Sequence, residues 1–94
     1  MSFKKEVYQA THAWAGKGDK RLRALQREVM MEFIIHAEIS GARAKGQVGK
    51  STVVNFWKKQ RLQNISFESE MIYWNAINEL WIIWEKLGEP PRPR

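Results

Sequence analysis

The stretch SFESEMIYWNAINELWIIWEKL, residues 66–87, decides the fold because it predicts one long, strongly apolar helix. Ser66 is a favourable N-cap, and Glu68 and Glu70 follow in the first turn, where the helix dipole favours carboxylates. Apolar residues then recur at steps of three and four, the period of a helix. They are Tyr73, Ile77, Leu80, Trp84 and Leu87. Gly88 is a natural C′ residue and Pro90 prevents continuation, so we expect a central core helix that the rest of the chain covers.

Three further helices are predicted upstream, over about residues 3–15, 20–40 and 50–60, and no segment has the pattern of a strand. Ser2 and Asp19 are the expected caps of the first two helices. In the second helix, Leu22 and Leu25 begin an apolar stripe that we expect to face inward. The pattern predicts an all-α fold, a compact four-helix bundle formed by one domain over residues 1–88. The Pro-rich residues 89–94 predict an extended, flexible basic tail or linker.

Composition narrows the possible classes of protein. The chain has 94 residues, which favours one domain, and no Cys, which excludes disulfides and thiolate metal sites. No apolar run is long enough to span a membrane, and the first residues do not resemble a signal peptide, so we expect a cytoplasmic protein. His36 falls on the apolar face of its helix and is interpreted as a core residue. With two His in all, neither a metal nor a cofactor is predicted.

The net charge of +6 is concentrated in two basic clusters. The first cluster comprises Lys17, Lys20, Arg21, Arg23 and Arg27. The second cluster comprises Arg43, Lys45, Lys50, Lys58, Lys59 and Arg61. No acidic residue lies between Ile39 and Phe67. Both clusters fall at helix starts and loops, which favours a polyanion-binding surface over the alternative of a merely solvated basic face.

A phosphate-binding-loop pattern has to be weighed within the second cluster. Residues 44–51, AKGQVGKS, fit the loose form of that loop, with Ala in place of its first Gly. The loop functions between a buried strand and a helix, and the residues before it are polar and broken by Gly, so we interpret the match as spurious. No catalytic arrangement of residues is evident elsewhere, and we expect no enzyme. Backbone amides and Lys50 at a helix start still favour contact with a phosphate.

From Val48 onward the chain resembles the N-terminal core-binding (SAM-like) domain of tyrosine recombinases and phage integrases. The segment VGKSTVVNFWKK, residues 48–59, is similar to the short helix of that domain. The helix that follows resembles the family pattern at Ser66, Ala76, Ile77, Leu80, Trp81 and Trp84. The Pro-containing residues 87–93 resemble the family's connection to its catalytic domain. The likeness covers roughly residues 19–93, while Glu68 and Glu70 depart from the family's usually polar or basic helix start.

The resemblance implies a non-catalytic module that clamps one side of duplex DNA, chiefly through backbone phosphates, and is nucleoid-associated when bound. Nothing corresponds to the recombinase catalytic domain, so we expect no DNA cleavage. Both basic clusters would contact phosphates, and three polar residues are candidates for hydrogen bonds to phosphates or base edges. These three are Ser51, Thr52 and Asn55.

The alternative hypothesis is a small helical protein–protein module or regulator from a phage or mobile element. Trp74 and Trp81 are seven residues apart and share one flank of the last helix. If a chain this short leaves that flank uncovered, the two indoles would form a partner site or a homodimer surface. If the first helix covers them, they belong to the core.

Overall fold

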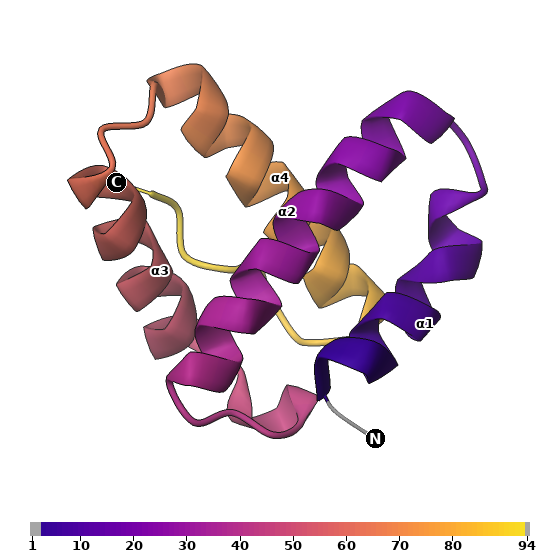
Figure 1. Cartoon of the computed structure of the whole chain (residues 1–94), viewed down its shortest axis with the longest axis horizontal. Helices are drawn as coiled ribbons and strands as arrows, with labels where there is room; N and C mark the ends of the chain where they lie inside the picture. The colour runs from indigo at the N-terminus through magenta and orange to yellow at the C-terminus, as the bar shows by residue number, and fades with distance from the viewer. Residues whose placement is uncertain (1–2, 94) are drawn as a thin grey trace.

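The structure, a computed structural model that describes residues 3–93, is all-helical, as the sequence predicts (Figure 1). Its elements are α1 (Phe3–Ala15), α2 (Lys20–Ile39), the short 3₁₀ helix η1 (Lys45–Gln47), α3 (Lys50–Leu62) and α4 (Phe67–Ile83). Over residues 3–93 there is no strand. The expected cap Ser2 and the last tail residue Arg94 lie outside the described residues.

Helix α2, rather than α4, is the centre of the arrangement. It packs against each of the other three helices. In Figure 1, α1 and α2 form an antiparallel hairpin, α4 crosses behind α2, and α3 lies on the side away from α1. The last helix is a core helix covered by the rest of the chain, as predicted, but it is α2 that contacts every other helix. The strong apolar character of α4 reflects cover by α2, by neighbouring aromatic rings and by the C-terminal tail.

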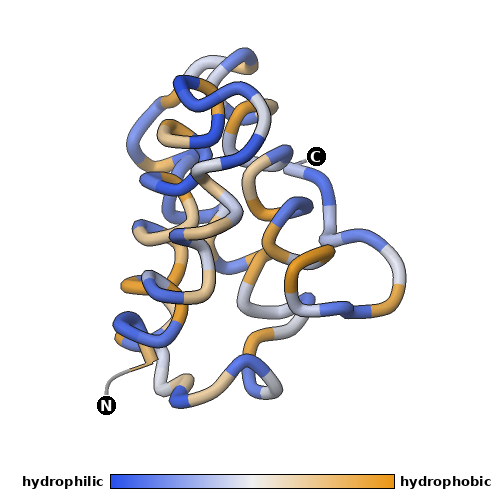
Figure 2. Tube along the Cα trace, turned by 90° about the vertical axis from the view of Figure 1, so that its right-hand side faces the viewer, coloured by the Kyte–Doolittle hydropathy of each residue, from blue (hydrophilic) through white to orange (hydrophobic). Residues whose placement is uncertain are grey.

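The core forms where α2, α3 and α4 meet. Phe33 of α2 contacts Phe56 of α3 edge-on, with ring centroids 5.2 Å apart, and Phe56 stacks on Tyr73 of α4 at 6.0 Å. Edge-on and offset ring pairs of this kind add to the free energy gained by burying apolar area. Phe3 of α1 closes the other end by stacking on Trp84. In Figure 2, hydrophobic residues recur along each helix between hydrophilic ones. Each helix therefore has an apolar face that can enter the core.

The first turns of α2 are less covered than predicted. Leu22 and Leu25, expected to face inward, are 49% and 42% exposed. Because α4 crosses α2 instead of running alongside it, the apolar residues on the inner face of α2 are buried only from Val29 onward, as Val29, Met30 and Phe33 show.

Helix α4 ends four residues before the predicted end. Its last turn closes with the N–H of Lys86 donating to the carbonyl of Trp81 at 3.0 Å and the N–H of Glu85 donating to Ile82 at 3.0 Å. This is the Schellman arrangement, with Glu85 in the left-handed conformation at φ 57°. Glu is an unusual residue for that conformation, so the sequence carried no sign of this end. As a result Leu87, predicted to belong to the core stripe, is 96% exposed.

The C-terminal tail is extended but lies against the protein. Pro90 and Pro93 are buried, and the carbonyls of Pro90 and Pro91 accept hydrogen bonds from Trp74 and Trp57. The sequence predicted a flexible arm because Pro-rich, charged residues are typical of linkers. In the structure the tail instead completes the cover of α3 and α4.

Candidate nucleic-acid interface

The outer face of α3 carries three of the six members of the second basic cluster. Because Val53, Phe56 and Trp57 turn into the core, the opposite face is presented to solvent. The exposed polar side chains of α3 are Lys50, Ser51, Asn55, Lys58 and Arg61, and the apolar Val54 and Leu62 are exposed on the same helix. The helical period thus places three cations and two short hydrogen-bonding side chains along one surface, which we call the α3 face.

The N-terminus of α3 is the start of the α3 face and has no side-chain cap. Its N-cap is Gly49, which has no side-chain oxygen, whereas Asp19 accepts from two amides at the start of α2 and Ser66 accepts from one at the start of α4. The first turn of α3 also contains no acidic residue. An uncapped helix N-terminus presents backbone N–H groups and positive dipole charge, which favour a bound anion.

The expected polar contact Thr52 is already used locally. Its hydroxyl oxygen accepts a hydrogen bond from the N–H of Gly49 at 3.2 Å and is half-buried. Thr52 therefore shapes the helix start. Ser51 and Asn55 are exposed and have no side-chain hydrogen bond within residues 3–93.

The loop before α3 contributes one tethered cation and one free cation. The Nη1 of Arg43 donates to the carbonyls of Glu38 and Ala42 at 3.2 and 3.1 Å, and its backbone N–H donates to Gln47 Oε1 at 2.6 Å. Arg43 therefore stabilises the loop that carries η1. Lys45, the first residue of η1, is exposed, and its side chain makes no such contact with residues 3–93.

Local carboxylates do not neutralise this surface. Within residues 3–93 one ion pair at or below 4.0 Å occurs, between Arg92 and Glu89 of the tail at 3.8 Å. Among these residues, no carboxylate is paired with a cation of the α3 face or with Lys45.

Lys59 differs from its neighbours because it lies on the side of α3 that faces α2. It is half-buried, and its charge lowers the pKa of His36 on α2, after the larger effect of burial, which lowers that pKa in the same direction. His36 lies against the ring of Phe56, and its Nε2 has no hydrogen-bond partner among the described residues. Lys59 thus belongs to the α2–α3 contact more than to the α3 face.

The first basic cluster separates into two groups. Arg23 lies over the ring of Trp14 at 4.6 Å, and its Nη1 donates to the Trp14 carbonyl at 2.7 Å. Arg27 lies over Tyr8 at 3.9 Å, donates through Nη2 to the Tyr8 carbonyl at 2.6 Å, and donates through Nε to Thr11 Oγ1 at 3.1 Å. Both guanidinium groups bind α1. They hold the hairpin together and are not free phosphate contacts.

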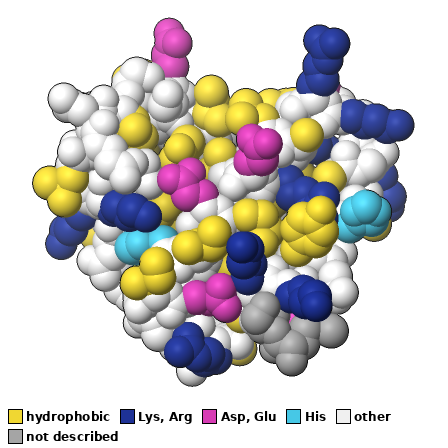
Figure 3. Space-filling view, in the orientation of Figure 1, with side chains coloured by type: hydrophobic (Ala, Val, Ile, Leu, Met, Phe, Trp, Pro, Cys, Tyr) yellow, Lys and Arg dark blue, Asp and Glu magenta, His cyan; other side chains and the backbone are white. Residues whose placement is uncertain are grey.

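The remaining members of the first cluster, Lys17, Lys20 and Arg21, are exposed at the turn between α1 and α2. This turn and the start of α3 lie near opposite ends of α2, which spans roughly 28 Å at 1.5 Å per residue. In Figure 3, basic side chains lie at the left and lower edges, over α3 and η1, and others lie at the upper right, over that turn. The two clusters therefore do not merge into one patch.

The residues of the phosphate-loop match lie in a helical setting. Helix α2 precedes residues 44–51, and the match contains η1 and the start of α3, so the strand that such a loop follows is not present among the described residues. Over the whole described range, residues 3–93, no group of three or more His, Asp or Glu side chains is placed to hold a metal ion.

The tryptophan flank predicted as a partner surface is buried. Trp74 is 6% exposed and lies against the tail, and Trp81 is 3% exposed beside Trp84 and Lys86. Of the two alternatives that the sequence left open, the open patch is excluded by this burial, and the two indoles belong to the core.

A different apolar surface is open between α1 and α2. A cavity of about 530 Å³ is lined by residues of both helices, among them Tyr8, Met31 and Ile35. At its edge the Tyr73 hydroxyl donates to Glu32 Oε2 at 3.1 Å. Burial, and then the charge of Glu32, raise the pKa of that hydroxyl. On the face drawn in Figure 3, hydrophobic side chains over α1 and α2 are interspersed with acidic and basic ones.

No protein-family model, curated protein or solved structure matches the chain. None of the described helices combines the length and the apolar character that crossing a membrane requires.

Proposed function

We propose that the chain is a non-catalytic DNA-binding module that grips duplex DNA mainly through backbone phosphates. The observation that carries the proposal is the start of α3, where an uncapped helix N-terminus without first-turn acids lies beside Lys45 and Lys50. Backbone amides and lysine ammonium groups are the donors that phosphates take at such helix ends.

The proposed footprint extends along the α3 face. Lys50, Lys58 and Arg61 neutralise successive phosphates, and Ser51 and Asn55 donate hydrogen bonds to phosphates or base edges. Lys17, Lys20 and Arg21 form a second contact at the other end of α2. Because α2 is roughly 28 Å long and one duplex turn is about 34 Å, we propose that the two contacts are made about one turn apart on one straight duplex.

The resemblance of residues 48–59 and of α4 to recombinase core-binding domains supports the same function. It also motivates the proposal of a SAM-like arrangement of the four helices and of a nucleoid-associated, cytoplasmic protein. The acidic start of α4, at Glu68 and Glu70, implies that this helix N-terminus stays away from the DNA and leaves α3 as the principal contact.

The test is fluorescence anisotropy of a labelled duplex of about 20 base pairs, titrated with wild-type chain, Lys50→Glu and the matched variant Lys4→Glu. Lys4 and Lys50 are both exposed, lie in the first turn of a helix and give the same change of charge. We expect Lys50→Glu to weaken binding about tenfold and Lys4→Glu to weaken it far less. Equal losses of affinity in the two variants would mean that binding depends only on net charge, and would contradict a role for the start of α3.

The cavity between α1 and α2 favours a second candidate function, a helical protein-interaction module. Tyr8 and Ile35 at this cavity are 52% and 39% exposed, so two large apolar side chains are accessible at the same open surface. Substituting Ile35 with Glu would abolish capture of such a partner and leave DNA binding unchanged, whereas Lys50→Glu would have the opposite effects.

A further inference from the structure

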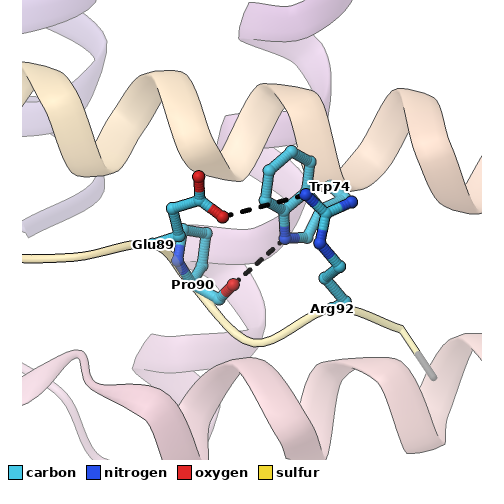
Figure 4. Close-up of polar contacts among 4 residues, drawn as sticks. All are labelled: Trp74, Glu89, Pro90 and Arg92. Atoms are coloured by element: carbon cyan, nitrogen blue, oxygen red, sulfur yellow. Dashed lines mark hydrogen bonds and ion pairs between the residues drawn. The ribbon is translucent and has the colours of Figure 1, made fainter.

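The C-terminal tail is held by a pair of indole groups that reach it from two helices. Trp57 of α3 donates through Nε1 to the carbonyl of Pro91 at 2.9 Å. Trp74 of α4 donates through Nε1 to the carbonyl of Pro90 at 3.1 Å. Figure 4 shows the tail between the two helices, with the indole of Trp74 directed at Pro90. Two buried donors from different helices thus bind two successive carbonyls.

The side chains of the tail complete the contact. The guanidinium of Arg92 lies over the ring of Trp74, 4.2 Å from its centre, and pairs with Glu89 at 3.8 Å, as Figure 4 shows. Pro90 and Pro93 are buried. Arg92 and Pro93 also line a cavity of about 280 Å³ together with Phe67 and Met71, at the start of α4.

The sequence of the tail suits this mode of binding. Pro90, Pro91 and Pro93 each have φ near −65°, and Glu89, Pro90 and Arg92 each precede a proline and are restricted to extended conformations. Every residue from 89 to 93 is therefore pre-set to an extended, polyproline-like path. Proline has no N–H, so its carbonyl is the backbone group that a partner can bind. Because the segment is already extended, it loses little conformational entropy when it docks.

We propose that Trp57 and Trp74 form a recognition site for proline-rich segments of a partner protein, and that the chain's own residues 89–93 occupy it in cis. Indole donors, an aromatic surface for the prolines and a ring for one basic residue are the elements by which proteins bind Pro-rich ligands. The ligand class is a segment with the pattern Pro-Pro-basic-Pro. This site lies apart from the proposed DNA contact and does not depend on it.

The test uses the 94-residue chain with its tail disabled by Pro90→Ser, Pro91→Ser and Pro93→Ser. Its probe is the labelled peptide LGEPPRPR, the sequence of residues 87–94, and the matched control is LGESSRSR, which has the same charges. We expect saturable anisotropy with the first peptide only, and shifts of the indole N–H resonances of Trp57 and Trp74. Trp57→Phe in the same background keeps an aromatic ring, loses one donor and should bind about fivefold more weakly.

The wild-type chain should bind the same peptide more weakly than the tail variant, because its own tail competes. With an effective concentration of about 1 mM and a peptide Kd of about 100 µM, the difference is on the order of tenfold. Equal binding by both chains, equal binding of both peptides, or no binding by a folded tail variant would each overturn the proposal.

A tail variant that fails to fold is replaced by the ¹⁵N-labelled wild-type chain titrated with unlabelled peptide. If the peptide displaces the tail, the backbone amide resonance of Arg92 moves to the position of an undocked tail. A resonance that does not move at millimolar peptide overturns the proposed displacement. If the wild-type chain is a dimer and the Arg92 amide resonance moves to the position of an undocked tail on dilution, the site is occupied by the tail of a second copy. That result would overturn occupation in cis.

Discussion

The contact of Arg27 with α1 gives the sharpest stability prediction. Replacing Arg27 with Ala removes two hydrogen bonds, to Thr11 Oγ1 and to the Tyr8 carbonyl, and the stacking on the Tyr8 ring. Each hydrogen bond contributes about 1 kcal/mol and the stacking about 0.5–1 kcal/mol. The guanidinium is partly exposed, so we expect a total loss of about 2 kcal/mol and a fall in Tm of about 10 °C.

The assay is urea unfolding followed by far-UV circular dichroism, with Arg21→Ala as the matched control. Arg21 lies on the same helix and is exposed, and within residues 3–93 its side chain has no hydrogen bond or ion pair. Its removal should change the free energy of unfolding by less than about 0.5 kcal/mol. Arg27→Lys keeps the charge but loses the planar fork, so it should be closer to Arg27→Ala than to wild type. Arg27→Ala as stable as Arg21→Ala would refute the assignment of Arg27 to the hairpin.

Three further predictions concern single positions. The pKa of His36 is lower in the folded chain than in the unfolded chain, so the free energy of unfolding should fall as the pH drops below about 6.5. Denaturant titrations from pH 7.5 to 5 measure this dependence of the free energy of unfolding on pH. It should be lost in His36→Gln and kept in the control His12→Gln. Glu85 is left-handed, so Glu85→Gly should raise the free energy of unfolding by about 0.5–1 kcal/mol in urea, and a loss would place the helix end elsewhere. Gln60 is 1% exposed and both its amide atoms have no partner among the described residues, so Gln60→Met should raise Tm by a few degrees in calorimetry; a lower Tm would reveal a bound water or another partner there.

Local sequence signals predicted the helices well wherever a residue has a strong preference. The range 3–15 matches α1, and Asp19 and Ser66 cap α2 and α4 through their side chains. Gly41, with φ 106°, ends α2, as a glycine commonly does. The end of α4, which the sequence predicted four residues too late, is also set by a left-handed residue just after the helix. Glu85 takes the conformation in which Gly is expected, and tertiary packing overrides its preference.

The candidate site was harder to predict because tertiary partners determine which charges are free. Arg23 and Arg27 are 9 and 16–19 residues away from the groups on α1 that they bind, and no local pattern relates them. Likewise, Trp74 is covered by a segment whose composition is typical of a linker. The helical period did place Asn55 and Lys58 opposite Val53, Phe56 and Trp57. Lys59, which the same period predicts to face outward, is half-buried towards His36 of α2.

The most direct test of the DNA-binding account is the dependence of duplex affinity on salt, measured by anisotropy with a random duplex of about 20 base pairs. Each phosphate neutralised adds about −0.9 to the slope of log K against log salt. The account predicts a steep slope for the wild-type chain and a slope shallower by about 0.9 for Lys50→Gln, which removes one contact. A flat salt dependence, or no binding at low salt, would contradict the account.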